Sequence, residues 1–324
     1  MRAVLIHRDT TGTTLAVGEA PEPALAPGSV RIAVRAGSVN YVDQFVPEGG
    51  YGTPPADGTA WVAGLDAAGE VLEVGAGVTD VRVGDRVMTM TAGGLAEQVV
   101  VDARCLVPVP DGWSDEDAAA AVVGLLTECD ALTAAGAFAP GDQVLVTGAT
   151  SGMGMQGVQL ARSLGAARVI ALARSDRADD VLRGLGADLV LHSTGSGFAD
   201  DVLAATGGNG VDLTVDHVGG AYFPDIVAAT AVRGRIVNVG RVAGTEVTAD
   251  LEAFSLKRLT LRGVTFRTRS ADELAAMYAG VRALDLTDLR PTIDRVVPWE
   301  ETQEAQRLLA TGSVVGKVVI RVGA

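Results

Sequence analysis

Short apolar or alternating runs, the pattern of β-strands, dominate the first third of the chain. These runs occupy residues 3–6, 30–34, 67–74 and 86–90. Clusters of glycine and proline separate them, as at Pro21-Glu22-Pro23 and Gly75-Ala76-Gly77. Many short strands with frequent turn signals predict a compact β-rich domain.

The pattern changes near Ser114, where three acidic residues and an alanine-rich apolar run follow. This is typical of a helix N-cap with an acidic first turn. Beyond this point strand-like runs alternate with helical spacing, which predicts a parallel sheet covered by helices. The predicted strands are 143–147, 168–173, 189–192, 212–216, 235–239, 259–263 and 316–322, and the predicted helices are 155–164, 179–185, 271–284 and 300–310.

Composition narrows the class of protein. The 324 residues predict about two domains, and 48% apolar against 20% charged residues argues against disorder. A formal net charge of −14 argues against binding to nucleic acid or to an anionic membrane. The sequence contains no run of about 18 uncharged apolar residues, so it predicts no membrane-spanning helix. Arg8 and Asp9 end the N-terminal apolar run too early for a secretion signal. We therefore expect a cytoplasmic protein that binds neither membrane nor nucleic acid.

The segment after the predicted strand 143–147 is rich in glycine. It reads Gly148-Ala149-Thr150-Ser151-Gly152-Met153-Gly154 and leads into the predicted helix 155–164. Small residues let the backbone approach a pyrophosphate, and a helix N-terminus supplies N–H donors. The strict G-x-G-x-x-G spacing is not met, but the order of strand, turn and helix predicts a dinucleotide site. Its predicted binding residues are Ala149, Ser151, Gly152, Met153 and Gly154.

The residues after the next predicted strand distinguish NADPH from NADH. In an NAD site an acidic residue stands about 20 residues past the glycines, and here that position is Arg174. Arg174, Ser175 and Arg177 offer guanidinium and hydroxyl donors to a 2′-phosphate, although Asp176 adds an opposing charge. The alternative is a solvated loop of mixed charge. We predict that the cofactor is NADPH.

With these motifs the chain resembles the zinc-independent quinone oxidoreductases of the medium-chain dehydrogenase/reductase superfamily. The resemblance runs through nearly the whole chain. Its motifs include Gly37-Ser38-Val39-Asn40-Tyr41-Val42-Asp43, Gly64-Leu65-Asp66-Ala67-Ala68-Gly69, Val83-Gly84-Asp85-Arg86-Val87, Pro140-Gly141-Asp142-Gln143-Val144, Asp216-His217-Val218-Gly219-Gly220 and Gly316-Lys317-Val318-Val319.

The resemblance implies an α/β protein of two domains. A GroES-like β-rich catalytic domain would comprise residues 1–118 and 264–324. A Rossmann domain, with a doubly wound parallel sheet, would comprise residues 119–263 and bind NADPH. The resemblance also implies a cofactor in the cleft between the domains, a small-molecule quinone or enone as substrate, and a homodimer.

The resemblance also bears on metal binding. Zinc-dependent relatives carry a catalytic cysteine, a Gly-His-Glu motif and a four-cysteine lobe. Here Asn40 stands at the cysteine position, and Leu65-Asp66 replaces the His-Glu pair. A catalytic zinc ion typically needs three protein ligands, and His7, His192 and His217 are far apart in the sequence. We expect no metal, and we interpret the histidines as surface or strand-end residues.

Chemistry without a metal depends on the cofactor, which would carry a hydride to a quinone or an α,β-unsaturated carbonyl compound. The resulting oxyanion needs a hydrogen-bond donor and then a proton. By resemblance, Asn40 would lie near nicotinamide and substrate, and Tyr51 would line the substrate pocket and bind the oxyanion. The plainer alternatives are a turn-capping residue for Asn40 and a packed aromatic for Tyr51.

Other residues are assigned by the same resemblance. Thr127, Gly240 and Lys317 would contact the cofactor, although a solvated lysine is an equal alternative for Lys317. Asp43 and Asp66 would organise hydrogen bonds near the site rather than act as bases.

The chain departs from the family pattern in two places. Glu128-Cys129-Asp130 follows Thr127 where apolar residues are usual, and Ser193 stands where many relatives have a tyrosine. If Glu128 and Asp130 faced the substrate pocket, they would favour a redox-neutral tailoring enzyme. A non-catalytic NADPH-binding protein on the same fold is the other alternative. Cys105 and Cys129 are too few for a disulfide framework, and we expect them to be buried small residues.

Overall fold

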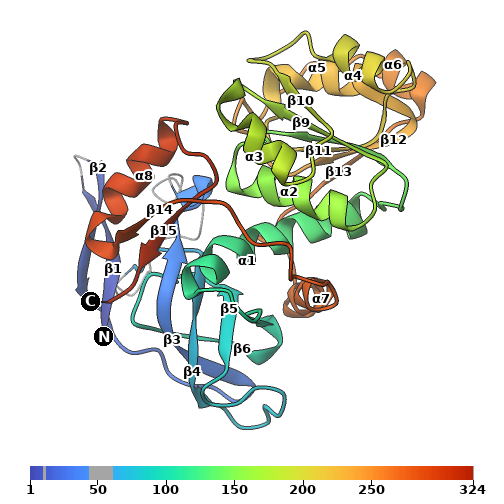
Figure 1. Ribbon diagram of the computed structural model, residues 1–324. Coiled ribbons are helices and arrows are strands. Elements are labelled where there is room, and N and C mark those ends of the chain that lie inside the picture. Colours follow the sequence, from blue (N-terminus) through green and yellow to red (C-terminus); the bar gives the residue numbers. More distant parts are fainter. Residues whose placement is uncertain (10–11, 44–60, 324) are drawn as a thin grey trace. The chain divides into compact units, whose positions relative to one another are not determined.

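The computed structural model describes residues 1–9, 12–43 and 61–323. The chain divides into two compact units (Figure 1). Unit 1 comprises Met1–Val123 and Leu274–Ala324, and unit 2 comprises Gly124–Glu273.

Unit 1 is built around a mixed sheet of seven strands. Its order is β14-β15-β3-β4-β5-β7, with β6 paired to β3, and every pair is antiparallel except β14 with β15. The strands are β3 (Ser29–Ser38), β4 (Asp66–Val74), β5 (Arg86–Met90), β6 (Gln98–Asp102), β7 (Val107–Pro108), β14 (Ile293–Pro298) and β15 (Lys317–Arg321). A separate hairpin pairs β1 (Arg2–Asp9) with β2 (Gly12–Glu19).

The core of unit 1 follows from alternation along its strands. Val30, Ile32 and Val34 on β3 are buried while their neighbours are partly exposed, because successive side chains of a strand point to opposite faces. Helix α8 (Thr302–Ala310) contacts β14 and β15. Helix α7 (Ala271–Arg282) is anchored by Tyr278, whose buried hydroxyl accepts the N–H of Met90 at 2.7 Å. The strands predicted near 3–6, 30–34, 67–74 and 86–90 are confirmed.

Unit 2 contains a six-stranded sheet in which every neighbouring pair is parallel. The order is β10-β9-β8-β11-β12-β13, the doubly wound order that changes direction between β8 and β11. The strands are β8 (Gln143–Thr147), β9 (Arg168–Ala173), β10 (Leu189–His192), β11 (Val211–Asp216), β12 (Thr230–Asn238) and β13 (Thr260–Gly263). The predicted α/β class and parallel sheet are confirmed.

Helices connect the strands of this sheet. They are α2 (Gly152–Ser163), α3 (Asp179–Gly184), α4 (Ala199–Ala205), α5 (Phe223–Ala229) and α6 (Leu251–Lys257). The positions predicted for α2 and α3 are confirmed. Helices α4, α5 and α6 have only seven residues each, too few for a helical period to stand out in the sequence.

Helix α1 (Asp115–Asp130) begins with the predicted cap. The Asp117 N–H donates to the Ser114 hydroxyl at 3.0 Å, and the Ser114 N–H donates to the Asp117 carboxylate at 2.9 Å, a reciprocal capping arrangement. The stretch Asp115–Ala135 is long and apolar enough to cross a membrane, but 83% of its most apolar window is buried. This stretch does not meet the criterion of about 18 uncharged apolar residues used on the sequence, because Glu128 and Asp130 interrupt the apolar run.

Candidate functional site

The glycine-rich turn of unit 2 joins the end of β8 to the start of α2. Gly148 has a φ of 62°, which glycine adopts without strain. The Ser151 hydroxyl accepts the N–H of Gly154 at 3.0 Å and donates to the carbonyl of Gly148 at 2.8 Å. A Cβ at Gly154 would lie 2.5 Å from that carbonyl oxygen. The turn is therefore tightly closed, and its small residues are a geometric requirement.

The five residues predicted to bind a dinucleotide lie together in this turn and in the first turn of α2. Ala149, Gly152 and Gly154 are buried, whereas Ser151 is exposed and Met153 is partly exposed. Backbone N–H groups at the start of a helix attract anions. The arrangement can hold a pyrophosphate.

The predicted 2′-phosphate residues directly follow β9. Arg174, Ser175 and Arg177 are all exposed. Burial raises the pKa of the Tyr222 hydroxyl, and the nearby positive charge of Arg174 partly offsets that rise. The same hydroxyl donates to the Ser193 carbonyl at 2.9 Å.

Tyr222 is a candidate that sequence reasoning missed. The family pattern has a tyrosine at position 193, where this chain has a serine, but the phenol of Tyr222 reaches the Ser193 carbonyl from 29 residues further along the chain. A short 3-10 turn, Gly220–Tyr222, presents it. No local sequence signal connects Tyr222 to Ser193, so only the fold could reveal their contact.

The carboxyl ends of β8, β11 and β12 meet at one edge of the sheet. His217 follows β11, and its carbonyl oxygen lies 2.2 Å from where a Cβ at Gly240 would stand. The Cβ of His217 would lie 3.3 Å from a Cβ at Gly148. Ligands of open α/β sheets bind at this edge, where the strand order reverses. Gly240, predicted to contact the cofactor, therefore lies at the same edge as the glycine turn, and His217 contacts both.

The acidic residues that follow Thr127 are buried in unit 2, as is Thr127 itself. Glu128 Oε1 lies 2.7 Å from His217 Nε2, and Asp130 Oδ2 lies 2.6 Å from Arg269 Nη2. Burial lowers the pKa of His217, but the charge and hydrogen bond of Glu128 outweigh it, so the net shift is upwards. Asp130 is thus held in an ion pair by Arg269, whose side chain is 23% exposed, and Glu128 is held by its contact with His217.

A second polar cluster lies in unit 1. Asp66 accepts from the Ser38 N–H at 2.5 Å, from the Ser38 hydroxyl at 2.6 Å and from Asn40 Nδ2 at 2.8 Å. Lys317 Nζ donates to Asn40 Oδ1 at 2.7 Å. Asp43 accepts the Asn40 N–H at 2.7 Å. We name Asn40, Asp43, Asp66 and Lys317 the Asn40 cluster. All four residues are buried.

The charges of the Asn40 cluster are only partly compensated. Burial raises the pKa of Asp66, and the positive charge of Lys317 offsets part of that rise. Burial lowers the pKa of Lys317, and the negative charges of Asp66 and Asp43 offset part of that fall. Burial also raises the pKa of Asp43 to about 7, although the hydrogen bond from the Asn40 N–H lowers it in part. Asp66 and Asp43 thus organise hydrogen bonds as expected, and the alternative of a solvated Lys317 is wrong, because its side chain is buried.

Asn40 links the carboxylate of Asp66 to the ammonium group of Lys317. One amide hydrogen goes to Asp66 and the other reaches the Ser38 carbonyl at 3.3 Å. A substrate oxyanion would have to compete with Asp66 and the Ser38 carbonyl for the two amide hydrogens of Asn40. The catalytic role of Asn40 stays a prediction. Tyr51, the other predicted catalytic residue, lies outside the described residues.

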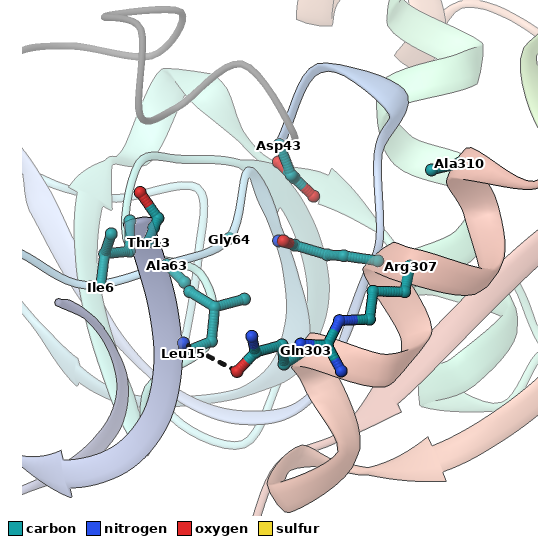
Figure 2. A pocket seen from close by; sticks show the side chains of 10 residues that line it. Ile6, Thr13, Leu15, Asp43, Ala63, Gly64, Gln303, Arg307 and Ala310 are labelled. Atoms are coloured by element: carbon teal, nitrogen blue, oxygen red, sulfur yellow. Dashed lines mark hydrogen bonds between the residues drawn. The ribbon is translucent and has the colours of Figure 1, made fainter. Parts of the chain in front are cut away.

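Unit 1 also contains a cavity of about 300 Å³. Figure 2 shows Asp43 on one side of it and Gln303 and Arg307 of α8 on the other. The Leu15 N–H reaches Gln303 Oε1 at 3.4 Å across its wall. Its volume is at the lower end of small-molecule pockets. Sequence reasoning missed the cavity because its lining residues come from distant segments.

The metal-binding residue types are dispersed. Among residues 1–9, 12–43 and 61–323, no three His, Cys, Asp or Glu side chains form a group that could hold a metal ion. His7 and His192 are exposed, as predicted, whereas the strand-end His217 is buried. Cys129 is buried as expected and Cys105 is partly exposed. Burial raises the pKa of both thiols, which disfavours reactive thiolates.

Two family models match the chain. Residues 26–111 match the alcohol dehydrogenase GroES-like domain, and residues 152–280 match the zinc-binding dehydrogenase model. Together with the two sheets described above, these matches confirm the predicted combination of a GroES-like domain and a Rossmann domain.

Similar proteins were found among curated sequences and solved structures. Polyketide synthase GfsB of Streptomyces halstedii is 43% identical over 175 residues, which are 54% of this chain but 3% of that protein. The chain thus spans a small fraction of the length of the curated relatives it matches. An NAD-dependent alcohol dehydrogenase is 31% identical, with 100% of both chains covered and a TM-score of 0.86.

Two mycobacterial structures are also similar. One is Rv1454c complexed with NADPH, at 28% identity with 99% of this chain and 100% of that chain covered and a TM-score of 0.84. The other is a quinone oxidoreductase, at 28% identity with the same coverage and a TM-score of 0.83. The three solved structures are similar to this chain along its whole length and not only within one domain.

Proposed function

Because the chain belongs to the quinone oxidoreductase-like family of the medium-chain dehydrogenase/reductase superfamily, it is an oxidoreductase, and we propose that it uses NADPH to reduce a quinone or an α,β-unsaturated carbonyl compound. One observation carries the choice of cofactor. Exposed Arg174 and Arg177 follow β9, at the place where an NAD site has an acidic residue. The NADPH complex among similar structures supports this choice, although an NAD-dependent relative exists.

The residues of unit 2 fit this cofactor. The turn around Gly148 and Gly154 is closed so tightly that a side chain at Gly154 would strike backbone, which leaves the N–H groups at the start of α2 to hold the pyrophosphate. Arg174, Ser175 and Arg177 would hold the 2′-phosphate, with Tyr222 beside them. When bound, NADPH supplies the hydride.

The acceptor class follows from what the chain's own residues can provide. Asn40 and Asp66 stand where zinc-dependent relatives have metal ligands, so polarisation of the acceptor must come from hydrogen bonds. Quinones and enones carry an electrophilic carbon that needs little further activation. A quinone oxidoreductase among the similar structures supports the quinone. We propose that Tyr51 donates a hydrogen bond to the developing oxyanion and that Thr127 contacts the nicotinamide.

A redox-neutral reaction finds no support in the buried acids. Glu128 is paired with His217 and Asp130 with Arg269, so neither carboxylate is a free general base. NADPH consumption distinguishes the proposed reductase from both the redox-neutral enzyme and the non-catalytic binding protein.

The test measures oxidation of NADPH and NADH with a panel of quinones and enones. We expect turnover that prefers NADPH, and an Arg174→Ala variant that loses about tenfold or more of that preference, because a charge-assisted hydrogen bond contributes about 1.5–3 kcal/mol. Arg183→Ala, another exposed arginine of unit 2, is the matched control and should keep the preference. NADPH binding without oxidation of any acceptor would contradict the reductase.

We also propose that the protein forms a homodimer through unit 2. Strand β13 lies at the edge of the parallel sheet, and exposed apolar side chains occur along residues 242–261, the segment that leads into this strand and includes its first residues. They are Val242, Val247, Leu251, Leu256 and Leu261. An exposed edge strand with apolar neighbours favours pairing with a second copy. Sedimentation of the wild type and of Leu256→Lys should give a dimer and a weakened dimer, and a monomeric wild type would contradict this proposal.

A further inference from the structure

Glu128 and His217 form a buried acid–base pair that the proposed reaction does not use. Glu128 lies on α1 and is fully buried, and His217 follows β11 and is 7% exposed. Their Oε1 and Nε2 atoms are 2.7 Å apart. Burying two ionisable groups is costly unless they compensate each other, so this contact is a strong constraint on both.

The hydrogen-bond geometry fixes where one proton lies. His217 Nδ1 is 2.8 Å from the Thr147 carbonyl oxygen, which only accepts, so Nδ1 carries a hydrogen. Nε2 and the Glu128 oxygen would repel each other as two bare lone pairs, so a second proton lies between them. If that proton is lost, a buried carboxylate remains without compensation, since its other oxygen has no hydrogen-bond partner among the described residues.

The surrounding helices are shaped around the Glu128 side chain. Gly124 and Glu128 lie one turn apart on the same face of α1, opposite Gln156 and Gly157 of α2. A Cβ at Gly157 would lie 2.6 Å from Glu128 Oε2, and a Cβ at Gly124 would lie 1.5 Å from Gln156 Oε1. Each long polar side chain thus occupies the space above a glycine of the other helix.

The pair is connected directly to the turn that would bind the dinucleotide. The His217 N–H donates to the Thr147 hydroxyl at 2.9 Å, and that hydroxyl donates to Asp216 at 2.8 Å. Thr147 is the last residue of β8 and immediately precedes Gly148. His217 therefore holds the end of β8 through both its ring and its backbone.

The charged groups that face His217 are Glu128 from α1 and Asp216 from its own segment. Thr147 of β8, which contacts both the ring and the backbone N–H of His217, carries no charge. The imidazolium form is therefore set against two carboxylates at the edge of the sheet. When it loses its proton, the edge gains one net negative charge.

We propose that Glu128 and His217 are positioning residues for NADPH: their shared proton fixes the end of β8 and offsets negative charge at the phosphate-binding edge, so that loss of this proton weakens binding of the dinucleotide. This inference rests on the proposed function, because it concerns the same cofactor. By linkage, NADPH must in turn favour the protonated pair.

The test measures the dissociation constant of NADPH between pH 7 and pH 9.5, where the 2′-phosphate, with a second pKa of about 6, no longer titrates. We expect the wild type to weaken by about fivefold or more across this range. Calorimetry in buffers of different ionisation enthalpy should detect proton uptake on binding within this range.

Two variants separate the charge from the fold. His217→Asn places its amide nitrogen near the position of Nδ1 and keeps a donor for Thr147, and the double variant Glu128→Gln/His217→Asn removes both ionisable groups. In the double variant we expect weaker binding at pH 7, no pH dependence and no proton uptake, whereas His217→Asn alone should weaken binding at pH 7 while Glu128 remains as a buried ionisable group. His7→Gln, an exposed histidine of unit 1, is the control and should follow the wild type.

The outcomes separate this inference from the proposed function. A wild type that binds NADPH with no pH dependence and no proton uptake would overturn the inference and leave the function standing. A wild type that fails to bind NADPH at any pH would overturn the function itself. Because proton uptake is measured on the wild type, a variant that does not fold leaves the inference open to refutation.

Discussion

The two units bury their charges in different ways. In unit 1, one ammonium group, Lys317, is set against two carboxylates, and Asp66 accepts three hydrogen bonds. In unit 2, Glu128 is set against His217 alone, and one carboxylate oxygen has no partner among the described residues. The Asn40 cluster depends on a network of hydrogen bonds, whereas the Glu128–His217 pair depends on a single proton.

Both arrangements favour low pH, but in different ranges. The pKa of Asp43 is raised from 3.8 to about 7, so its stabilising contribution is complete below pH 4 and is lost as pH rises through 7. The pKa of His217 is raised from 6.5, so its contribution is complete below pH 6.5 and is lost at higher pH. The pH dependence of unfolding can therefore distinguish the two.

The largest effect should come from removing the cation of unit 1. Lys317→Met leaves the buried Asp66 and Asp43 without a compensating charge, and we expect a loss of about 3–5 kcal/mol in the free energy of unfolding. Urea denaturation measures it. Lys257→Met, whose ammonium group bonds only backbone carbonyls of unit 2, is the comparison. A smaller loss for Lys317→Met than for Lys257→Met would show that the cation does not hold the cluster.

Asp43→Asn should change how stability depends on pH. The amide can still accept the Asn40 N–H but does not titrate. Relative to the wild type, we expect the variant to gain about 2–3 kcal/mol between pH 5 and pH 8, from a pKa shift of about three units at 1.36 kcal/mol each. Urea denaturation at both pH values gives the difference. Equal differences at pH 5 and pH 8 would rule out a raised pKa for Asp43.

Gly157→Ala tests how closely α2 fits Glu128. The new methyl group would lie 2.6 Å from Glu128 Oε2, and we expect a loss of about 1–3 kcal/mol in the free energy of unfolding. The same substitution in a Glu128→Ala background should cost less, because the clash is gone. Gly184→Ala, at a helical glycine with no described atom within 4 Å of its Cβ position, should be neutral or slightly stabilising. Equal effects of Gly157→Ala in both backgrounds would disprove the fit.

The dinucleotide turn was predictable because its chemistry is local. Strand β8, the turn and α2 follow one another within 21 residues, and the periodicity of each element is visible in the sequence. The bounds of β5, β8, β9 and β10 matched the prediction. The same holds for Arg174, which is found by counting from Gly154.

The two buried clusters could not be predicted, because their partners are distant in the chain. Asn40 and Lys317 are 277 residues apart, and Glu128 and His217 are 89 residues apart. From the sequence, Glu128 was only a departure from the family pattern and His217 a strand-end histidine. The signal that could have found the pair was the occurrence of Gly124 and Gly157 opposite long polar residues, and this becomes meaningful only when two helices are known to pack.

The smallest effect should come from a histidine–carboxylate contact at the surface. His192 Nε2 lies 2.8 Å from Asp179 Oδ1, almost the same distance as in the buried pair, but the His192 side chain is 39% exposed. Asp179 also pairs with Arg183 at 2.9 Å, so removal of His192 leaves no uncompensated charge. We expect His192→Gln to change the free energy of unfolding by about 0–0.5 kcal/mol, against several times as much for His217→Asn. Urea denaturation of both variants at pH 7 makes the comparison, and equal losses would mean that burial does not set the strength of the Glu128–His217 contact.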